Sequence, residues 1–404
     1  MVGAPAPPKL LSIDDALALV AAHITPLPIE HVALADSYGR FLAEALRATI
    51  DLPPFPSSSM DGYALRATDR PKRLAIVGES SAGSPYLGKL GEHEAVAIST
   101  GAVVPQDADS VVPLEDVVSL EDGSEIELNG PVAPGAFVRR RGSDIHRGAP
   151  LLATGTRLGP AQIGAAAAVG AATVACRRRP SVAFLTTGSE LRQPGEALAD
   201  GEIYDANAPM MHAALLTSGA VVAHLPAAAD SREAHRAALA QALEHDVVVS
   251  SGGVSVGAHD LVRDIGAELG VREVFWRVAL RPGRPLAFGV RGATLVFGLP
   301  GNPVSTIVCF ELFVRPALLA LQGAPSARPS WRSGSLAVAV KQNAQRDDLI
   351  RVSVSSTGVL SPLRGQESHQ IAVAAQADAV ALIPAGTGEL PAGREVAYLP
   401  LQAF

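Results

Sequence analysis

The sequence predicts a multidomain α/β protein, because its residue pattern changes character three times along the chain. From Ser181 to Gln322, short buried-type strands alternate with amphipathic helical runs. From Asp51 to Gly148, short β-branched runs are broken by Gly, Pro and Asp, which is typical of a β-rich module. Beyond a Pro/Ser-rich linker at 324–329, alternating residues predict a further small β domain. A chain of 404 residues is long enough for roughly two to four domains.

The α/β region predicts a doubly wound parallel sheet. We expect strands at 182–186, 221–225, 247–250 and 294–297, with helices at 207–218, 231–245, 261–269 and 304–322. Strands separated by helices form a parallel sheet with right-handed crossovers and helices on both faces. Ligands bind beyond the carboxyl ends of such strands. The loops Thr187–Glu190, Ser251–Asp260 and Gly298–Pro303 are expected at that edge.

The flanking segments are expected to form a few regular elements. Ser12–Ala22 predicts a helix with Ser12 as N-cap and acidic residues in its first turn. The apolar run 159–176 predicts a second, closely packed helix. Strands are expected in the β-rich module at 73–77, 95–99, 110–113 and 125–128, and after the linker at 333–340, 349–354 and 396–399.

Composition excludes several classes of protein. The chain is 48% hydrophobic and carries a formal charge of −7, so nothing attracts it globally to nucleic acid or an anionic membrane. Its two cysteines, Cys176 and Cys309, have no CxxC spacing, which argues against disulfides and thiolate zinc sites. Asp14 and Asp15 interrupt the apolar N-terminal stretch, unlike a signal peptide. The Ala/Gly-rich run 158–176 inserts poorly into membranes. We therefore expect a cytoplasmic protein.

A glycine-rich segment, SSGGVSVG at 250–257, follows an expected strand and precedes an expected helix that starts at Asp260. Glycines allow close approach of a ligand to the backbone, and the N–H groups at a helix start bind phosphate. The spacing is not GxGxxG, so a dinucleotide site is not indicated. A packing turn, with Asp260 as a simple helix-terminal charge, is the alternative. The candidate binding residues are Ser250, Ser251, Gly252, Gly253, Ser255 and Gly257.

Charged residues gather at the same predicted edge. Glu190 ends the TGSE turn, where a carboxylate can hold Mg²⁺ or accept a proton, and Asp230 precedes a helix; each could instead be a cap. Arg277, Arg281 and Arg284 surround a Pro-Gly turn. Three neighbouring guanidiniums repel one another unless an anion joins them, although a solvated basic turn is the alternative. The GLPGNP turn supplies Pro300, Gly301, Asn302 and Pro303.

The β-rich module offers candidates that are not diagnostic alone. Asp61 lies in the loop PPFPSSSMDGYA, Thr100 in ISTGA, and Asp144 follows three arginines in RRRGSD. The segment GSPYLGKL at 83–90 approaches a P-loop, but Leu90 replaces the Ser or Thr that binds Mg²⁺.

Taken in this order, the motifs resemble the molybdopterin molybdenumtransferase family, which includes the bacterial molybdenum-insertion enzyme and the gephyrin E-domain. The similarity extends from about residue 10 to the C-terminus. The matching stretches are PPFPSSSMDGYA, ISTGA…ADSVV, VRRRGSDI, TTGSEL, GEIYDANAPM, VVVSSGGVSVGAHD, RPGRPLAFG and GLPGNPVS.

The resemblance implies a four-part subunit. Residues 1–26 plus 179–325 would form the doubly wound catalytic domain, and 27–49 plus 149–178 an elongated linking domain. Residues 50–148 would form the β-rich lobe and 326–404 a C-terminal β-barrel. It also implies a homodimer, with each active site shared between the catalytic domain of one subunit and the β-rich lobe of the other.

The implied reaction converts adenylyl-molybdopterin and molybdate into molybdenum-molybdopterin and AMP, with Mg²⁺ as cofactor. The implied partner is the molybdopterin adenylyltransferase that supplies the substrate. The metal ligands would be Glu190, Asp230 and Asp260. The implied catalytic residues are Asp61, Thr100, Asp144, Glu190, Asp230, Asp260, Arg277 and Arg281. The binding residues would be the glycine-rich set above with Arg284, Pro300, Gly301, Asn302, Pro303 and Ser368.

This sequence departs from the family pattern in places. Arg277, Arg281 and Arg284 stand where the family often has Lys, which keeps the charge but changes a point charge into a planar fork. Ser189 replaces an acidic residue common in this turn, and Ser57 and its neighbours replace an Asp-Asn-Ser sequence. Two alternatives are a non-catalytic pterin-binding or scaffold protein of the same fold, and the related adenylyltransferase. The latter resembles only the doubly wound domain.

Overall fold

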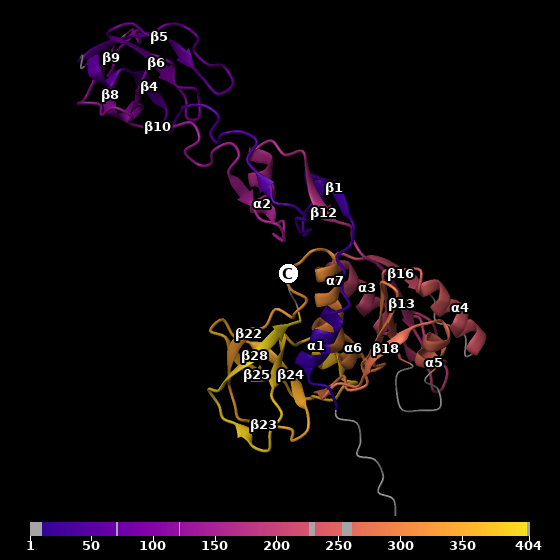
Figure 1. The fold of residues 1–404 in the computed structure, drawn as a ribbon. Coiled ribbons are helices and arrows are strands. Elements are labelled where there is room, and N and C mark those ends of the chain that lie inside the picture. The colour runs from indigo at the N-terminus through magenta and orange to yellow at the C-terminus, as the bar shows by residue number, and fades with distance from the viewer. Residues whose placement is uncertain (1–9, 70–71, 121, 226–230, 253–260, 402–404) are drawn as a thin grey trace, which may run out of the picture. The chain divides into compact units, whose positions relative to one another are not determined.

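The computed structural model describes residues 10–69, 72–120, 122–225, 231–252 and 261–401, with the chain drawn in Figure 1. The chain divides into two compact units. The first consists of residues 1–30, 39–43 and 175–404, and the second of 31–38 and 44–174. The second unit is therefore an insertion into the first.

A six-stranded sheet forms the centre of the first unit, in the order β16-β13-β17-β21-β20-β18. The first four strands, β16 (Val221–Leu225), β13 (Ser181–Thr186), β17 (Val247–Ser251) and β21 (Thr294–Leu299), are parallel, as predicted. The sequence patterns missed β20 (Ala287–Arg291) and β18 (Arg272–Trp276), which extend the sheet in antiparallel fashion. The doubly wound sheet is confirmed, with two antiparallel strands added.

Helices cover both faces of this sheet (Figure 1). Phe184 points into a core shared with α1 (Ile13–Ala21), α3 (Asn207–Thr217) and the helix at 303–321. Its neighbour Leu185 points to the other face, against α4 (Arg232–Ala242) and α5 (Leu261–Glu268). Alternate strand residues therefore supply two cores, as expected for a strand buried on both sides.

The helix at 303–321 consists of α6 (Pro303–Cys309), a π-helical turn (Phe310–Val314) and α7 (Arg315–Leu321). Within the described residues it alone is long and apolar enough to cross a membrane, but 83% of its apolar window is buried in the protein. Glu311 and Arg315 on this helix form an ion pair of 2.6 Å. It packs as a core helix of the α/β unit.

A closed β-barrel follows in the same unit. Its strands are β22 (Arg332–Leu336), β24 (Asp347–Val354), β25 (Val359–Pro362), β26 (Ala379–Ile383) and β28 (Glu395–Pro400). They run in the order β24-β25-β22-β28-β26, and β26 pairs back with β24 to close the barrel. The short strand β19 (Leu280–Arg281) adds to β24 in parallel. Smaller elements are β23 (Val340–Lys341), β27 (Glu389–Leu390), α8 (Ile371–Ala374), β14 (Leu191–Arg192) and β15 (Ile203–Tyr204).

The second unit is built on a six-stranded sheet in the order β7-β4-β6-β5-β9-β8. The predicted strands are present as β5 (Arg73–Ser80), β6 (Glu94–Ile98), β7 (Ser110–Pro113) and β9 (Glu125–Leu128). The strands β4 (Gly62–Leu65) and β8 (Val117–Ser119) were not predicted. Short pairs complete the unit: β3 (Ser57–Ser58) with β10 (Val138–Arg139), and β2 (Leu46–Arg47) with β11 (Pro150–Leu152). Single 3₁₀ turns lie at Leu34–Asp36, Ala67–Asp69 and Leu114–Asp116.

The predicted helix at 159–176 is wrong in its second half. Helix α2 covers only Pro160–Ala168, and Gly170 then adopts a φ of +84°, which ends the helix. Residues Thr173–Arg177 form β12, which pairs with β1 (Ile29–Ala33). The β-branched Thr173 and Val174 favour a strand once the glycine has turned the chain.

Candidate functional site

The loops that follow β13, β17 and β21 are joined by backbone hydrogen bonds at the carboxyl edge of the sheet. The Thr187 amide donates to the Ser251 carbonyl at 3.2 Å, and the Gly252 amide donates to the Leu299 carbonyl at 3.1 Å. Parallel strands end together at one edge, so the sequence order alone placed these loops side by side. The described beginnings of the three predicted loops therefore lie side by side at this edge.

Asn207, at the start of α3, ties two of these loops together. Its side-chain Nδ2 donates to Ser251 Oγ at 2.8 Å and to the Gly301 carbonyl at 2.7 Å. Thr306, one turn into α6, donates to the Pro300 carbonyl at 2.6 Å. Asn207 and Thr306 were not predicted as site residues. The motif GEIYDANAPM contained Asn207, whereas no pattern pointed to Thr306.

Two buried polar atoms at this edge have no hydrogen-bond partner within the described residues: Asn207 Oδ1 and Ser250 Oγ. The Gly301 carbonyl fixes the orientation of the Asn207 amide, because a flipped amide would place two oxygens against each other. Ser250 also lines a cavity of about 310 Å³ between α5 and the sheet, with Phe288 and Gly298. Buried polar groups are normally satisfied, so these atoms are available to a ligand or to ordered water.

Gly252 occupies a position that only glycine fits. Its φ is +92°, and a Cβ there would lie 2.8 Å from both the carbonyl oxygen and Oγ1 of Thr187. A Cβ on Gly301 would in turn lie 3.6 Å from Gly252 Cα. Gly252 thus lets the loop after β17 pack closely against Thr187. The other predicted residues of this region, Gly253, Ser255, Gly257 and Asp260, together with Asp230, lie outside the described residues.

Glu190 follows β13 with its carboxylate exposed and without an ion pair or side-chain hydrogen bond among the described residues. The carboxylate folds back over Gly188, where a Cβ would lie 2.6 Å from Glu190 Oε2. Mg²⁺ is commonly held by one or two carboxylates and keeps several waters, which a free, exposed carboxylate fits. Within the described ranges, no group of three His, Cys, Asp or Glu side chains could hold a metal ion. Glu190 is thus the one predicted metal ligand that can be described.

The members of the predicted arginine cluster make separate contacts within the protein. The Arg277 guanidinium stacks 3.7 Å from the centre of the Trp276 ring, and Arg263 lies 4.0 Å from the same ring. Arg281 forms an ion pair with Asp348 of the barrel, Nη2 to Oδ2 at 2.7 Å. Arg284 is exposed and has no ion pair within the described residues. The protein's own carboxylate and an aromatic ring therefore offset part of the repulsion that an external anion was expected to relieve.

A barrel loop also reaches the carboxyl edge. Asn302 Nδ2 donates to Ser368 Oγ at 2.8 Å, and the Val304 amide donates to the Ser368 carbonyl at 3.2 Å. Asn302 is the N-cap residue of α6 and is followed by Pro303 at the first helical position. The structure therefore brings Ser368 to the GLPGNP turn, although the two lie 66 residues apart in sequence.

In the second unit, Asp61 and Thr100 lie together. The Thr100 amide donates to Asp61 Oδ1 at 2.6 Å, and both residues are exposed. Among the described contacts no RRRGSD arginine pairs with Asp144, and Arg141 pairs with Asp51 at 2.7 Å. The Arg147 amide and the Arg141 side chain together lower the pKa of Asp51. Asp144 is exposed, and its amide donates to the Leu52 carbonyl.

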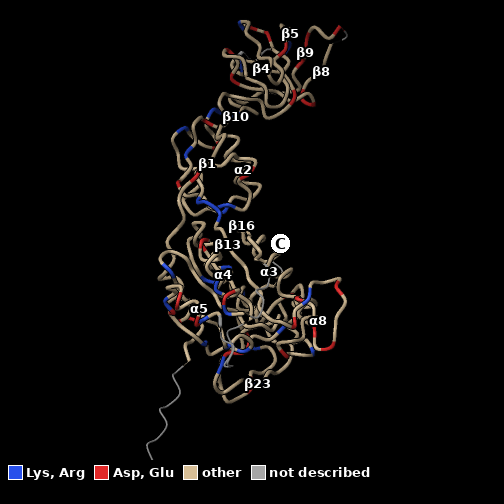
Figure 2. Tube along the Cα trace, turned by 90° about the vertical axis from the view of Figure 1, so that its right-hand side faces the viewer, with Lys and Arg blue, Asp and Glu red and all other residues tan. Residues whose placement is uncertain are grey.

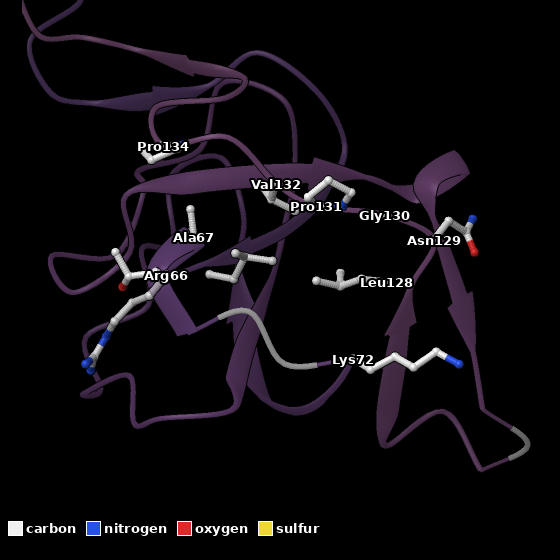
Figure 3. Close-up of a pocket in the computed structure, with 11 residues that line it drawn as sticks. Arg66, Ala67, Lys72, Leu128, Asn129, Gly130, Pro131, Val132 and Pro134 are labelled. Carbon is white, nitrogen blue, oxygen red and sulfur yellow. The ribbon is translucent and has the colours of Figure 1, made fainter.

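A further cavity of about 670 Å³ opens in the second unit, and Figure 3 shows its lining. Leu128 and Val132 contribute to an apolar floor, whereas Arg66 and Lys72 extend toward opposite sides. Arg66 donates to the Leu90 carbonyl, and Lys72 pairs with Glu127 at 2.7 Å. None of the predicted site residues lines this cavity.

The distribution of charged residues limits where an anion can bind. Acidic and basic residues are interspersed along the trace in both units (Figure 2), so anion binding must depend on local groups.

Cys176 and Cys309 are buried, and burial raises the pKa of both thiols. Neither cysteine has the exposure and low pKa of a reactive thiolate.

Three family models together match most of the chain. Residues 11–170 match the MoeA N-terminal region (domain I and II), residues 183–320 a probable molybdopterin binding domain, and residues 333–401 the MoeA C-terminal region (domain IV). These matches assign the doubly wound sheet to the class of probable molybdopterin binding domains, and the β-rich unit and the barrel to MoeA regions.

Relatives identify the family within that class. The chain is 32% identical to a molybdopterin molybdenumtransferase of Haemophilus influenzae, over 97% of this chain and 98% of the relative. It is 35% identical to the enzyme of that name from Synechococcus elongatus, over 96% and 98%. A structure of the molybdopterin biosynthesis MoeA protein from Pyrococcus horikoshii matches with a TM-score of 0.81 and 27% identity, over 97% and 100%. The chain belongs to the molybdopterin molybdenumtransferase family of enzymes, which confirms the resemblance and a role in molybdenum cofactor biosynthesis.

Proposed function

We propose that this enzyme transfers molybdenum from molybdate to adenylyl-molybdopterin, with release of AMP and formation of the molybdenum-molybdopterin cofactor. The observation that supports this best is the carboxyl edge of the sheet. Near the close-packed glycine at 252, Asn207 Oδ1 and Ser250 Oγ have no hydrogen-bond partner among the described residues. This edge lies within the stretch 183–320 that matches a probable molybdopterin binding domain.

The proposed chemistry divides among the residues of this edge. Backbone N–H groups of the glycine-rich segment would take phosphate, and Arg277, Arg281 and Arg284 would hold an oxyanion. The dithiolene sulfurs that receive molybdenum belong to the substrate, so no protein thiolate is required. This agrees with the burial of both cysteines.

Mg²⁺ would neutralise the pyrophosphate of the substrate. Glu190, Asp230 and Asp260 are the residues that would hold it, and the free carboxylate of Glu190 fits this role. The alternative role for this carboxylate, in place of metal binding, would be to accept a proton during cleavage of the pyrophosphate bond.

We further propose a cytoplasmic homodimer that receives its substrate from the molybdopterin adenylyltransferase. Each active site would combine Glu190 of one subunit with Asp61, Thr100 and Asp144 of the other. Asp61→Asn and Glu190→Gln homodimers should then both be nearly inactive. When equal amounts are unfolded and reassembled together, half of the dimers are mixed and each holds one intact site. About a quarter of wild-type activity should return, whereas sites built within one chain would recover none.

The reaction itself is tested by AMP release from adenylyl-molybdopterin with and without molybdate. We expect molybdate-dependent release that requires Glu190. A scaffold protein of the same fold would bind the substrate and release no AMP under either condition, and that result would overturn the proposed function.

A further inference from the structure

Arg281 is held against a strand of the barrel by backbone pairing. In the parallel pairing of β19 with β24, Leu280 lies opposite Asp347 and Arg281 opposite Asp348. The register brings the Arg281 guanidinium beside the Asp348 carboxylate, with Nη2 2.7 Å from Oδ2. The segment that carries the candidate oxyanion ligands is thus paired with a strand of the barrel that carries Asp347 and Asp348.

The two side chains of this ion pair differ in their exposure to solvent. The Asp348 side chain is 5% exposed, whereas the Arg281 side chain is 55% exposed. Asp348 Oδ1 is buried and has no hydrogen-bond partner among the described residues. Only one oxygen of the buried carboxylate therefore has a partner among the described residues, while more than half of the Arg281 side chain is exposed and its guanidinium carries further N–H donors.

A fixed carboxylate next to an anion-binding guanidinium opposes the anion. It neutralises the charge that attracts an oxyanion, and it offers Arg281 an alternative acceptor within the protein. We propose that Asp348 is an internal anion that competes with the substrate oxyanion for Arg281 and thereby keeps oxyanion affinity low. This inference rests on the proposed function, in which Arg281 contacts the oxyanion. Weak retention suits a site that must pass its oxyanion on to a second substrate.

A purely orienting role for Asp348 makes the opposite prediction. If the carboxylate only held Arg281 in a productive position, its removal would loosen the guanidinium and weaken oxyanion binding. If it competes, its removal frees the guanidinium and strengthens binding. The sign of the change in affinity separates the two roles.

The test is calorimetric titration of the full-length chain with sodium molybdate in the absence of pterin. Asp348→Asn keeps the side-chain shape and removes the charge, and we expect it to tighten molybdate binding about threefold to tenfold. Asp347→Asn is the matched control, because it removes the same charge one residue away. Asp347 projects toward the other side of β24, and its Oδ1 accepts from the Ala385 amide at 2.8 Å. Less than a twofold change is expected there.

A double-mutant cycle ties the effect to Arg281. The gain produced by Asp348→Asn should disappear in an Arg281→Gln background. Unchanged or weaker molybdate binding in Asp348→Asn, or an equal gain without Arg281, would overturn the inference. Melting curves check the fold, and Asp348→Ser replaces the Asn variant if that variant unfolds. Because binding is measured without AMP release, failure of the inference and failure of the proposed function are distinguishable.

Discussion

Two arginine–aspartate pairs in the same unit differ in how many hydrogen bonds the carboxylate accepts. Asp246, before β17, receives both Nη1 and Nη2 of Arg178 at 2.8 Å and also accepts from the Ser181 amide and hydroxyl. Asp348 receives one contact from Arg281, and its buried Oδ1 has no partner in the part of the chain that the structure describes. The first pair joins the starts of β13 and β17 and completes the fold. The second pair leaves the Arg281 guanidinium partly available to bind an anion beside the candidate site.

The pKa shifts of the two acids point in opposite directions. Burial raises the pKa of Asp246, but hydrogen bonds from Arg178 and Ser181 outweigh it and leave the pKa lowered. Burial also raises the pKa of Asp348, and there the attraction of Arg281 and Arg346 is too weak to reverse the shift. The ionised carboxylate is thus favoured by its surroundings at Asp246 and disfavoured at Asp348. Perturbed pKa values of this kind cluster at functional sites.

The largest expected effect is on stability at the saturated pair. Asp246→Ala leaves Arg178 and two Ser181 donors without an acceptor and should lower the free energy of unfolding by about 2–3 kcal/mol. This is below the value for a fully buried pair, because the Arg178 side chain is 41% exposed. Denaturant unfolding monitored by circular dichroism measures it. Equal destabilisation by Asp348→Asn would remove the distinction between the two pairs.

Acid should affect the two aspartates in opposite ways. Asp246 has a folded pKa below its unfolded value, so its stabilisation is present above about pH 4 and is lost as pH falls through the folded pKa. Asp348 has a raised folded pKa, so its charge costs stability at neutral pH, and that cost disappears as pH falls through the folded value. The free energy of unfolding is measured from neutral to acidic pH for wild type, Asp246→Asn and Asp348→Asn. The difference between each variant and wild type shows whether that aspartate stabilises or destabilises the fold at each pH. Parallel curves for the two variants would contradict the comparison.

A smaller effect is expected at the glycine beside the candidate site. Gly252→Ala combines a positive φ with a Cβ only 2.8 Å from the Thr187 carbonyl, whereas Gly270→Ala has a φ of +86° and open space around it. Both variants bear the cost of the backbone conformation, about 1 kcal/mol, and only the first adds a steric clash. Gly252→Ala should therefore be about 1 kcal/mol less stable than Gly270→Ala in thermal melts. Equal melting temperatures would show that the loops move apart freely.

Periodicity predicted most of the α/β unit because its strands are fully buried and its helices are amphipathic. The carboxyl-edge loops followed from the order of those elements. The antiparallel strands β18 and β20 were missed because the arginines and Pro-Gly turn between them favour a loop. The Arg281–Asp348 pair was missed because it depends on barrel register, which local sequence does not encode. Alanine-rich sequence also concealed the change from α2 to β12.

The most direct test of the proposed function is the stoichiometry of a single turnover. Adenylyl-molybdopterin and molybdate are incubated with the enzyme, then AMP and pterin-bound molybdenum are quantified in the same sample. We expect equal amounts of both, and neither product with Glu190→Gln. AMP released without molybdenum retained on the pterin would define a hydrolase and contradict molybdenum transfer.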